Sequence, residues 1–155
     1  MKKNKKIAII AFESNKTDLI EWSYFNKELL MPHQITAIGF AANILEGTLN
    51  KKTDYIEPGN FGGYRQLSNR IKENKIDAII IFGEAKEIFE TKELRVVIET
   101  ALINNIIVAA NKTTADFVIH SSLINSEYKI LSKEKKPVYK EVSANSAPFP
   151  LAKAS

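Results

Sequence analysis

Four short apolar runs, separated by segments with helical periodicity, constrain the fold of this chain more than any other feature. The runs are KIAIIAF, ITAIGF, IDAIIIFG and IIVAAN, at residues 6–12, 35–40, 76–83 and 106–111. Continuous apolar runs of this length are typical of strands that are buried on both faces of a sheet. A fifth run, TDYIEPG at 53–59, is shorter and more polar, which suits a strand at the edge of that sheet.

Between these runs the apolar residues recur with the spacing of packed helices. The predicted helices span residues 17–30, 64–74, 92–104 and 113–121. In the last of them we expect Thr113 or Thr114 as the N-cap, with Asp116 in the first turn. Strands that alternate with helices predict parallel strands joined by right-handed crossovers. The expected fold class is therefore α/β, a three-layer α/β/α sandwich.

The length of 155 residues fits one domain with a single core. The strand–helix pattern fails after about residue 131. We therefore expect a domain at 1–131 and a C-terminal arm or tail at 132–155, with a short strand at VYKEV. No segment has the length of a membrane span or the features of a signal peptide, which predicts a cytoplasmic protein.

Composition narrows the chemistry. The chain has no cysteine, which excludes disulfides, thiolate metal sites and cysteine nucleophiles. The formal charge of +4 comes largely from lysines near both ends, which form either two solvated tails or a polyanion-binding surface. No basic face with interleaved aromatics runs through the middle, so nucleic acid is not an expected partner. The two histidines, His33 and His120, are assigned structural roles, and no metal or cofactor site is expected.

In parallel sheets, ligands bind beyond the carboxyl ends of the strands, where loops and helix N-termini gather. Five loops are expected on that rim, at residues 12–16, 39–43, 57–64, 82–84 and 111–114. The third is rich in glycine, with Gly59, Gly62 and Gly63 just before Tyr64. Such a cluster means a positive φ or a close approach of the backbone to another group, here a ligand.

Several rim residues have both a functional and a structural interpretation. Lys16 and Arg65 either contact an anion or are solvated surface residues. Glu13 and Glu84 either form a carboxylate pair across the site or are exposed or tied to nearby lysines. The rim aromatics either form a stacking platform for a flat ligand or fill space inside the loops. These aromatics are Phe12, Phe40, Phe61 and Tyr64.

Four segments carry a resemblance to a known family. They are KKIAIIAFESNK, PGNFGGYRQL, NKIDAIIIFGEA and NNIIVAANKTTADFVIHSSLI, in this order along the chain. In order and spacing they resemble the methylglyoxal synthase family, over roughly residues 5–131. The resemblance implies a five-stranded parallel sheet of order 3-2-1-4-5 and a homohexamer. The family enzyme removes a proton from dihydroxyacetone phosphate and eliminates phosphate, which requires a carboxylate base, a neutral donor such as His, and a phosphate cradle.

The chain departs from the family pattern at most of these positions. Phe12-Glu13 stand where the family has His-Asp, although Lys16 matches the family lysine. The hydroxyl-rich phosphate loop is reduced here to Gly39-Phe40-Ala41-Ala42, with Asn43 just beyond. Tyr64 stands at the position of the catalytic Asp.

Three further carboxylates fall near positions that are acidic or catalytic in the family. Glu84 replaces an Asp after the fourth strand, and Glu93 aligns with another. No His stands before the next helix, where Glu90 or Thr91 is nearest. A tyrosine has an unperturbed pKa of about 10, against about 3.9 for Asp, and is a poor base at neutral pH.

Three hypotheses of function follow. The first is a non-catalytic protein of this family that binds a small anionic ligand, phosphorylated or a nucleotide, at the rim. The second is an active lyase of the methylglyoxal synthase type, in which Glu13, Glu84 or Glu90 takes a reassigned catalytic role. The third is an oligomer whose role is assembly. The expected ligand-binding residues are Lys16, Gly39, Phe40, Asn43, Gly59, Phe61, Gly62, Gly63, Tyr64, Arg65 and Thr113.

Overall fold

The fold is described by a computed structural model that covers residues 4–128. Its parallel sheet consists of β1 (Lys6–Ala11), β2 (Gln34–Ile38), β3 (Asp54–Ile56), β4 (Ala78–Phe82) and β5 (Ile107–Ala109). The strand order is β3-β2-β1-β4-β5, which confirms the predicted topology and places the short, more polar β3 at an edge. The expected arm at 132–155 and its strand lie outside the described residues.

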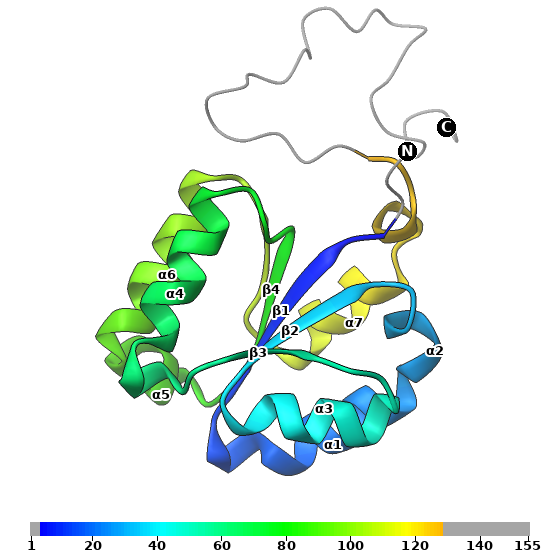
Figure 1. Ribbon diagram of the computed structural model, residues 1–155, viewed down its shortest axis with the longest axis horizontal. Helices are drawn as coiled ribbons and strands as arrows, with labels where there is room; N and C mark the ends of the chain where they lie inside the picture. Colours follow the sequence, from blue (N-terminus) through cyan, green and yellow to red (C-terminus); the bar gives the residue numbers. More distant parts are fainter. Residues whose placement is uncertain (1–3, 129–155) are drawn as a thin grey trace, which may run out of the picture.

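Helices cover both faces of this sheet (Figure 1). The helices are α1 (Lys16–Phe25), α2 (Lys27–Leu30), α3 (Phe40–Leu49), α4 (Gly63–Lys72), α5 (Ala85–Glu90), α6 (Lys92–Ile103) and α7 (Lys112–His120). Three short 3-10 turns accompany them: η1 (Glu13–Asn15), η2 (Gly59–Phe61) and η3 (Ser122–Asn125). α4, α5 and α6 pack on one face, and α1, α3 and α7 pack on the other.

The continuous apolar strands arise because alternate side chains enter different cores. Ile7 and Ile9 of β1 join the core under α1, α3 and α7. Ala8 and Ile10 of the same strand join the core under α4 and α6. Both faces of β1 are thus buried, and its neighbours β2 and β4 pair with it in register, for example Ile7 with Ile35 and with Ala78.

Three sequence-based expectations about the helices were wrong in part. The segment 17–30 is two helices, because the chain breaks at Asn26, whose Nδ2 donates to the carbonyl of Trp22 at 3.0 Å. Residues 40–43, expected as loop, are the first turn of α3, which buries Ala41, Ala42, Leu45 and Leu49. The short helix α5 was not predicted; it begins at a capping box between Glu84 and Glu87.

Two further corrections concern single residues. α7 is capped by Asn111 rather than by Thr113 or Thr114, since the Asn111 Oδ1 accepts from the Thr114 amide at 2.8 Å. Lys5 does not belong to a solvated tail: it is only 5% exposed, and its ammonium donates to the carbonyls of Ile124 and Ser126. From sequence alone, a lysine within a run of lysines near the N-terminus is expected to be solvated. The distant carbonyls that bury Lys5 become evident only in the structure.

Candidate functional site

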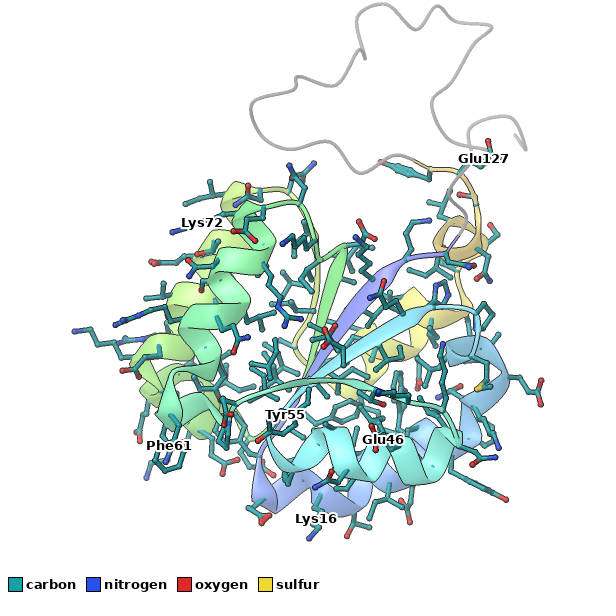
Figure 2. All side chains as sticks on the ribbon, viewed as in Figure 1. Lys16, Glu46, Tyr55, Phe61, Lys72 and Glu127 are labelled. Carbon is teal, nitrogen blue, oxygen red and sulfur yellow. The ribbon has the colours of Figure 1, made fainter. Side chains whose placement is uncertain are left out.

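The loops after the strands gather at one end of the molecule, as the parallel sheet requires. Figure 2 shows Lys16 and Phe61 at this end and Lys72 and Glu127 at the opposite end. The end that carries Lys16 and Phe61 is called the rim below. Four elements that begin there supply most of the candidate residues: η1, α1, α3 and the loop from β3 into α4.

Contacts within the protein explain the glycines of the β3–α4 loop. Gly62 has a φ of 92°, in the left-handed region that glycine adopts readily. A Cβ on Gly63 would lie 1.8 Å from the carbonyl oxygen of Glu57, and a Cβ on Gly59 would lie 2.2 Å from the ring of Tyr64. The predicted close approach is therefore an approach of the loop to itself and to Tyr64.

Tyr64 lies at the rim and also packs against the protein core. It is half-buried and contacts the core under α4 and α6. Burial, together with the nearby Glu93 carboxylate, raises its pKa above the ordinary value near 10. Both effects favour the protonated phenol, so at neutral pH this hydroxyl can donate a hydrogen bond but cannot act as an efficient base.

Lys16 and Phe40 connect the starts of α1 and α3. The Lys16 ammonium lies 5.9 Å from the centroid of the Phe40 ring, within cation–π range. Neither helix has a side-chain cap: Asn15 and Gly39 occupy the N-cap positions without such a hydrogen bond. The start of α4, after Gly62, also has no side-chain cap.

Gly39 itself is required by the backbone. It has φ 60° and ψ −133°, and its amide donates to the carbonyl of Ile56 at 2.9 Å. A Cβ at this position would also contact Pro58 at 3.4 Å. The turn thus presents the first residues of α3 next to the β3–α4 loop.

The acidic candidates lie on the surface of the rim. Glu13 is exposed in η1, Glu84 is exposed at the N-cap of α5, and Glu90 is exposed at the end of α5. The residue that connects these loops is Glu87, which was not predicted. Its Oε1 accepts from the Ser14 hydroxyl at 2.6 Å and from the Glu84 amide at 3.1 Å.

Most of the remaining candidates are exposed on the surface. Phe61 is 74% exposed, and Arg65, Asn43 and Thr113 are also exposed. Phe12, by contrast, packs against Gly83, whose Cβ position lies 2.6 Å from the Phe12 ring. The aromatic set therefore divides: Phe12 and Tyr64 fill space inside the loops, while Phe40 and Phe61 remain available to a ligand.

One of the two histidines, His33, has a structural role. His33 is fully buried, and its Nδ1 accepts from the Lys5 amide at 2.9 Å. Burial lowers its pKa below the ordinary 6.5. Within residues 4–128 no three His, Asp or Glu side chains form a group that could hold a metal ion. In the same range no helix has the length and apolarity needed to cross a bilayer.

The fold and the rim define a class: a single α/β/α domain with a 3-2-1-4-5 parallel sheet and candidate ligand residues at the strand C-termini. No family model matches the chain. It is, however, 35% identical over 125 residues to a methylglyoxal synthase of Coxiella burnetii (strain RSA 493 / Nine Mile phase I), covering 80% of this chain and 87% of that protein. It is 32% identical over 127 residues to a methylglyoxal synthase of Erwinia tasmaniensis, with coverages of 81% and 84%.

A solved structure shows the same likeness. The crystal structure of methylglyoxal synthase from Elizabethkingia anophelis NUHP1 superposes with a TM-score of 0.73 at 26% identity, over 81% of this chain and 84% of that one. The chain belongs to the methylglyoxal synthase family.

Proposed function

We propose that this protein binds a small phosphorylated ligand, or a nucleotide, at the rim and does not convert dihydroxyacetone phosphate to methylglyoxal. The observation that carries the proposal is Tyr64. The family resemblance places the catalytic carboxylate at this position. The tyrosine there is half-buried, and its pKa is raised by burial and by Glu93. A general base contributes roughly 10²–10⁴-fold in rate, so its loss together with the missing His would nearly abolish the elimination.

Attraction for an anion rests on the starts of α1 and α3. Neither helix start has a side-chain cap. The amides of Lys16 and Ala42 donate to the carbonyls of Glu13 and Gly39, and the helix dipole favours negative charge at both starts. Lys16 adds a full positive charge on the first residue of α1, beside Phe40 on the first residue of α3. Amide donors with a lysine are a common combination for phosphate recognition.

A flat group on the ligand would find aromatic surface nearby. Phe61 is 74% exposed and lies at the same end of the molecule as Lys16 (Figure 2). Stacking of a base on an aromatic side chain is worth about 1–3 kcal/mol, which favours a nucleotide over a bare sugar phosphate. The proposal places the protein in the cytoplasm, where such phosphorylated metabolites are made.

Thermal-shift and calorimetric titrations test binding, with inorganic phosphate, dihydroxyacetone phosphate and adenosine monophosphate as probes. Lys16→Ala and Arg65→Ala should each weaken the phosphorylated probes about ten-fold, because a charged hydrogen bond is worth about 1.5–3 kcal/mol. Lys72→Ala, an exposed lysine at the opposite end of the molecule, is the matched control and should have no effect. If no probe stabilises the wild type, the binding hypothesis is wrong and the assembly hypothesis replaces it.

A second candidate function is an active lyase, favoured by relatives that carry the name methylglyoxal synthase at 31–35% identity. In this hypothesis Glu13, Glu84 or Glu90 takes the proton in place of the missing Asp. Methylglyoxal release from dihydroxyacetone phosphate within about a hundred-fold of a typical rate of 1–10³ s⁻¹ would establish it. The loss of that activity in Glu84→Gln but not in Glu127→Gln would then identify the base.

A further inference from the structure

A second surface feature lies away from the rim, between α1 and α7. Tyr24 and Phe25 at the end of α1 and Phe117 on α7 are 70%, 82% and 77% exposed. Residues of both helices, Trp22 and His120 among them, line a hollow of about 550 Å³. These residues define the α1–α7 groove. Tyr24 and Phe25 line this hollow, and Phe117 lines a neighbouring one. Exposed aromatics that line adjoining hollows are typical of an interaction site.

The groove continues toward the point where the described chain ends. A neighbouring hollow shares Asp116 and His120 with the first and extends along Phe117 to Ser121, Ser122 and Leu123. The last of these residues belong to η3, and the carbonyls just beyond are fixed by the Lys5 ammonium, at 2.8 Å for Ser126. The described chain ends two residues later, at Tyr128, so the polypeptide leaves the domain beside the groove.

The sequence beyond Tyr128 contains a segment whose chemistry suits this surface. Residues 147–152 read APFPLA, an apolar stretch with Phe149 and Leu151 between prolines and small residues. The eighteen residues at 129–146 can span roughly 60 Å when extended, which is enough to reach any part of the groove. They include Lys133, Lys135 and Lys136, and the groove carries carboxylates at Glu21 and Asp116.

We propose that residues 147–152 dock into the α1–α7 groove of their own chain, with Phe149 and Leu151 covering the exposed aromatics. A tethered segment meets its site at a millimolar effective concentration, so a short apolar peptide of modest affinity is sufficient. The two prolines restrict the free segment and so reduce the entropy that it loses on binding. This proposal concerns a different surface from the rim and does not depend on the proposed function.

Disulfide trapping tests the proposal directly, since the natural chain has no cysteine. The full-length double variant Phe117→Cys/Leu151→Cys should form a disulfide within one chain under mild oxidation. The control Lys72→Cys/Leu151→Cys places the first cysteine at an exposed site on α4. This site lies at the same end of the molecule as Glu127, and α4 covers the face of the sheet opposite to α1 and α7 (Figure 2). Docking should make the Phe117 pair react at least about ten-fold faster than this control, because both pairs share the same tether.

Non-reducing gels then separate the outcomes. A fast-forming monomeric product supports the proposal. A disulfide-linked dimer would overturn it, because the occupant would be the segment of a second copy. Equal rates for the two pairs would overturn it as well, because the segment would then have no preference for the groove.

A second measurement avoids cysteine chemistry. Phe149→Asp in the full-length chain should raise the fluorescence of the apolar dye ANS several-fold, as the groove loses its cover. Phe149→Leu keeps an apolar side chain and should leave the dye signal near that of the wild type. An unchanged signal in Phe149→Asp would contradict docking.

Discussion

At the scale of the residue, several residues that look like functional candidates in the sequence have structural roles in the fold. Tyr64 occupies the expected position of a catalytic carboxylate, yet it packs on Gly59 and the core. Gly63 passes the carbonyl of Glu57 so closely that no side chain fits. His33 is a buried hydrogen-bond acceptor rather than a ligand. Two of these features lead to quantitative expectations.

Gly63 and Gly47 should respond oppositely to replacement by alanine. Gly63→Ala should destabilise the fold by roughly 2–3 kcal/mol or more, since its Cβ would lie 1.8 Å from a backbone oxygen that cannot move freely. Gly47→Ala, inside α3 with no atom within 4 Å, should stabilise it by about 0.5–1 kcal/mol. Urea unfolding of both variants measures the difference, and a neutral Gly63→Ala would contradict the described loop.

His33 should make stability depend on pH. Burial lowers its folded-state pKa below 6.5, so the unfolded chain binds more protons than the folded one as pH falls. The contribution is fully present above about pH 6.5 and is lost as pH falls toward the lowered folded value. The slope from this group is at most about 1.4 kcal/mol per pH unit.

The measurement compares the free energy of unfolding of wild type and His33→Asn between pH 7.5 and 5.5. The Asn side chain keeps an acceptor for the Lys5 amide but does not titrate. The wild type should lose more stability than the variant over this range. If the free energies of unfolding of the two proteins fall in parallel with pH, His33 has the same pKa in the folded and the unfolded chain and the prediction is wrong.

At the scale of the element, the helices that begin at the rim differ in whether a side chain caps their first backbone amides. α7 carries a side-chain cap from Asn111, and α5 carries a capping box with Glu87. α1, α3 and α4 have no side-chain cap. The helix starts without a side-chain cap are those next to Lys16, Phe40 and the glycine loop. The candidate ligand residues therefore lie at helix starts where no side chain competes with an anion for the backbone amides.

The cap of α7 can be tested against the residue that the sequence favoured. Asn111→Ala should cost about 1 kcal/mol, within the usual 0.5–2 kcal/mol for loss of an N-cap. Thr113→Ala should change the free energy of unfolding by less than about 0.5 kcal/mol, because its side chain is exposed and does not cap the helix. Chemical denaturation of the two variants decides between them, and the reverse order would restore the original assignment.

At the scale of the whole molecule, two exposed apolar regions within residues 4–128 lie on opposite layers. One is the α1–α7 groove. The other lies on α5 and α6, where Phe89, Leu102 and Ile103 are 66%, 63% and 58% exposed. Large exposed apolar side chains of this kind can be covered by contacts in an assembly. The family resemblance implies a hexamer, and the α5–α6 surface is our proposed contact between subunits.

Light scattering coupled to size-exclusion chromatography tests this assembly. The wild type should elute as a closed oligomer, with the mass of six chains. Leu102→Glu should reduce the mass, because it places a charge in the proposed contact, while Lys72→Glu on the neighbouring helix serves as the control. A wild type that is monomeric at micromolar concentration would contradict the hexamer.

The sequence by itself determined the sheet and its topology. The runs 7–12 and 78–82 are apolar at every position, which is typical of a strand buried on both faces, and the family motifs implied the strand order. It also predicted that the candidate ligand residues lie on one rim, because parallel strands end at one edge. These features follow from patterns that are local in the chain.

The tertiary structure alone decided which rim residues are free and which are committed to packing. Lys5, next to other lysines, is buried because its ammonium donates hydrogen bonds to carbonyls more than a hundred residues away. The glycine loop packs against Tyr64, and Glu87 joins two loops that are far apart in sequence. Such roles depend on partners from distant segments, and the spacing of residues along a chain does not specify which distant groups will meet.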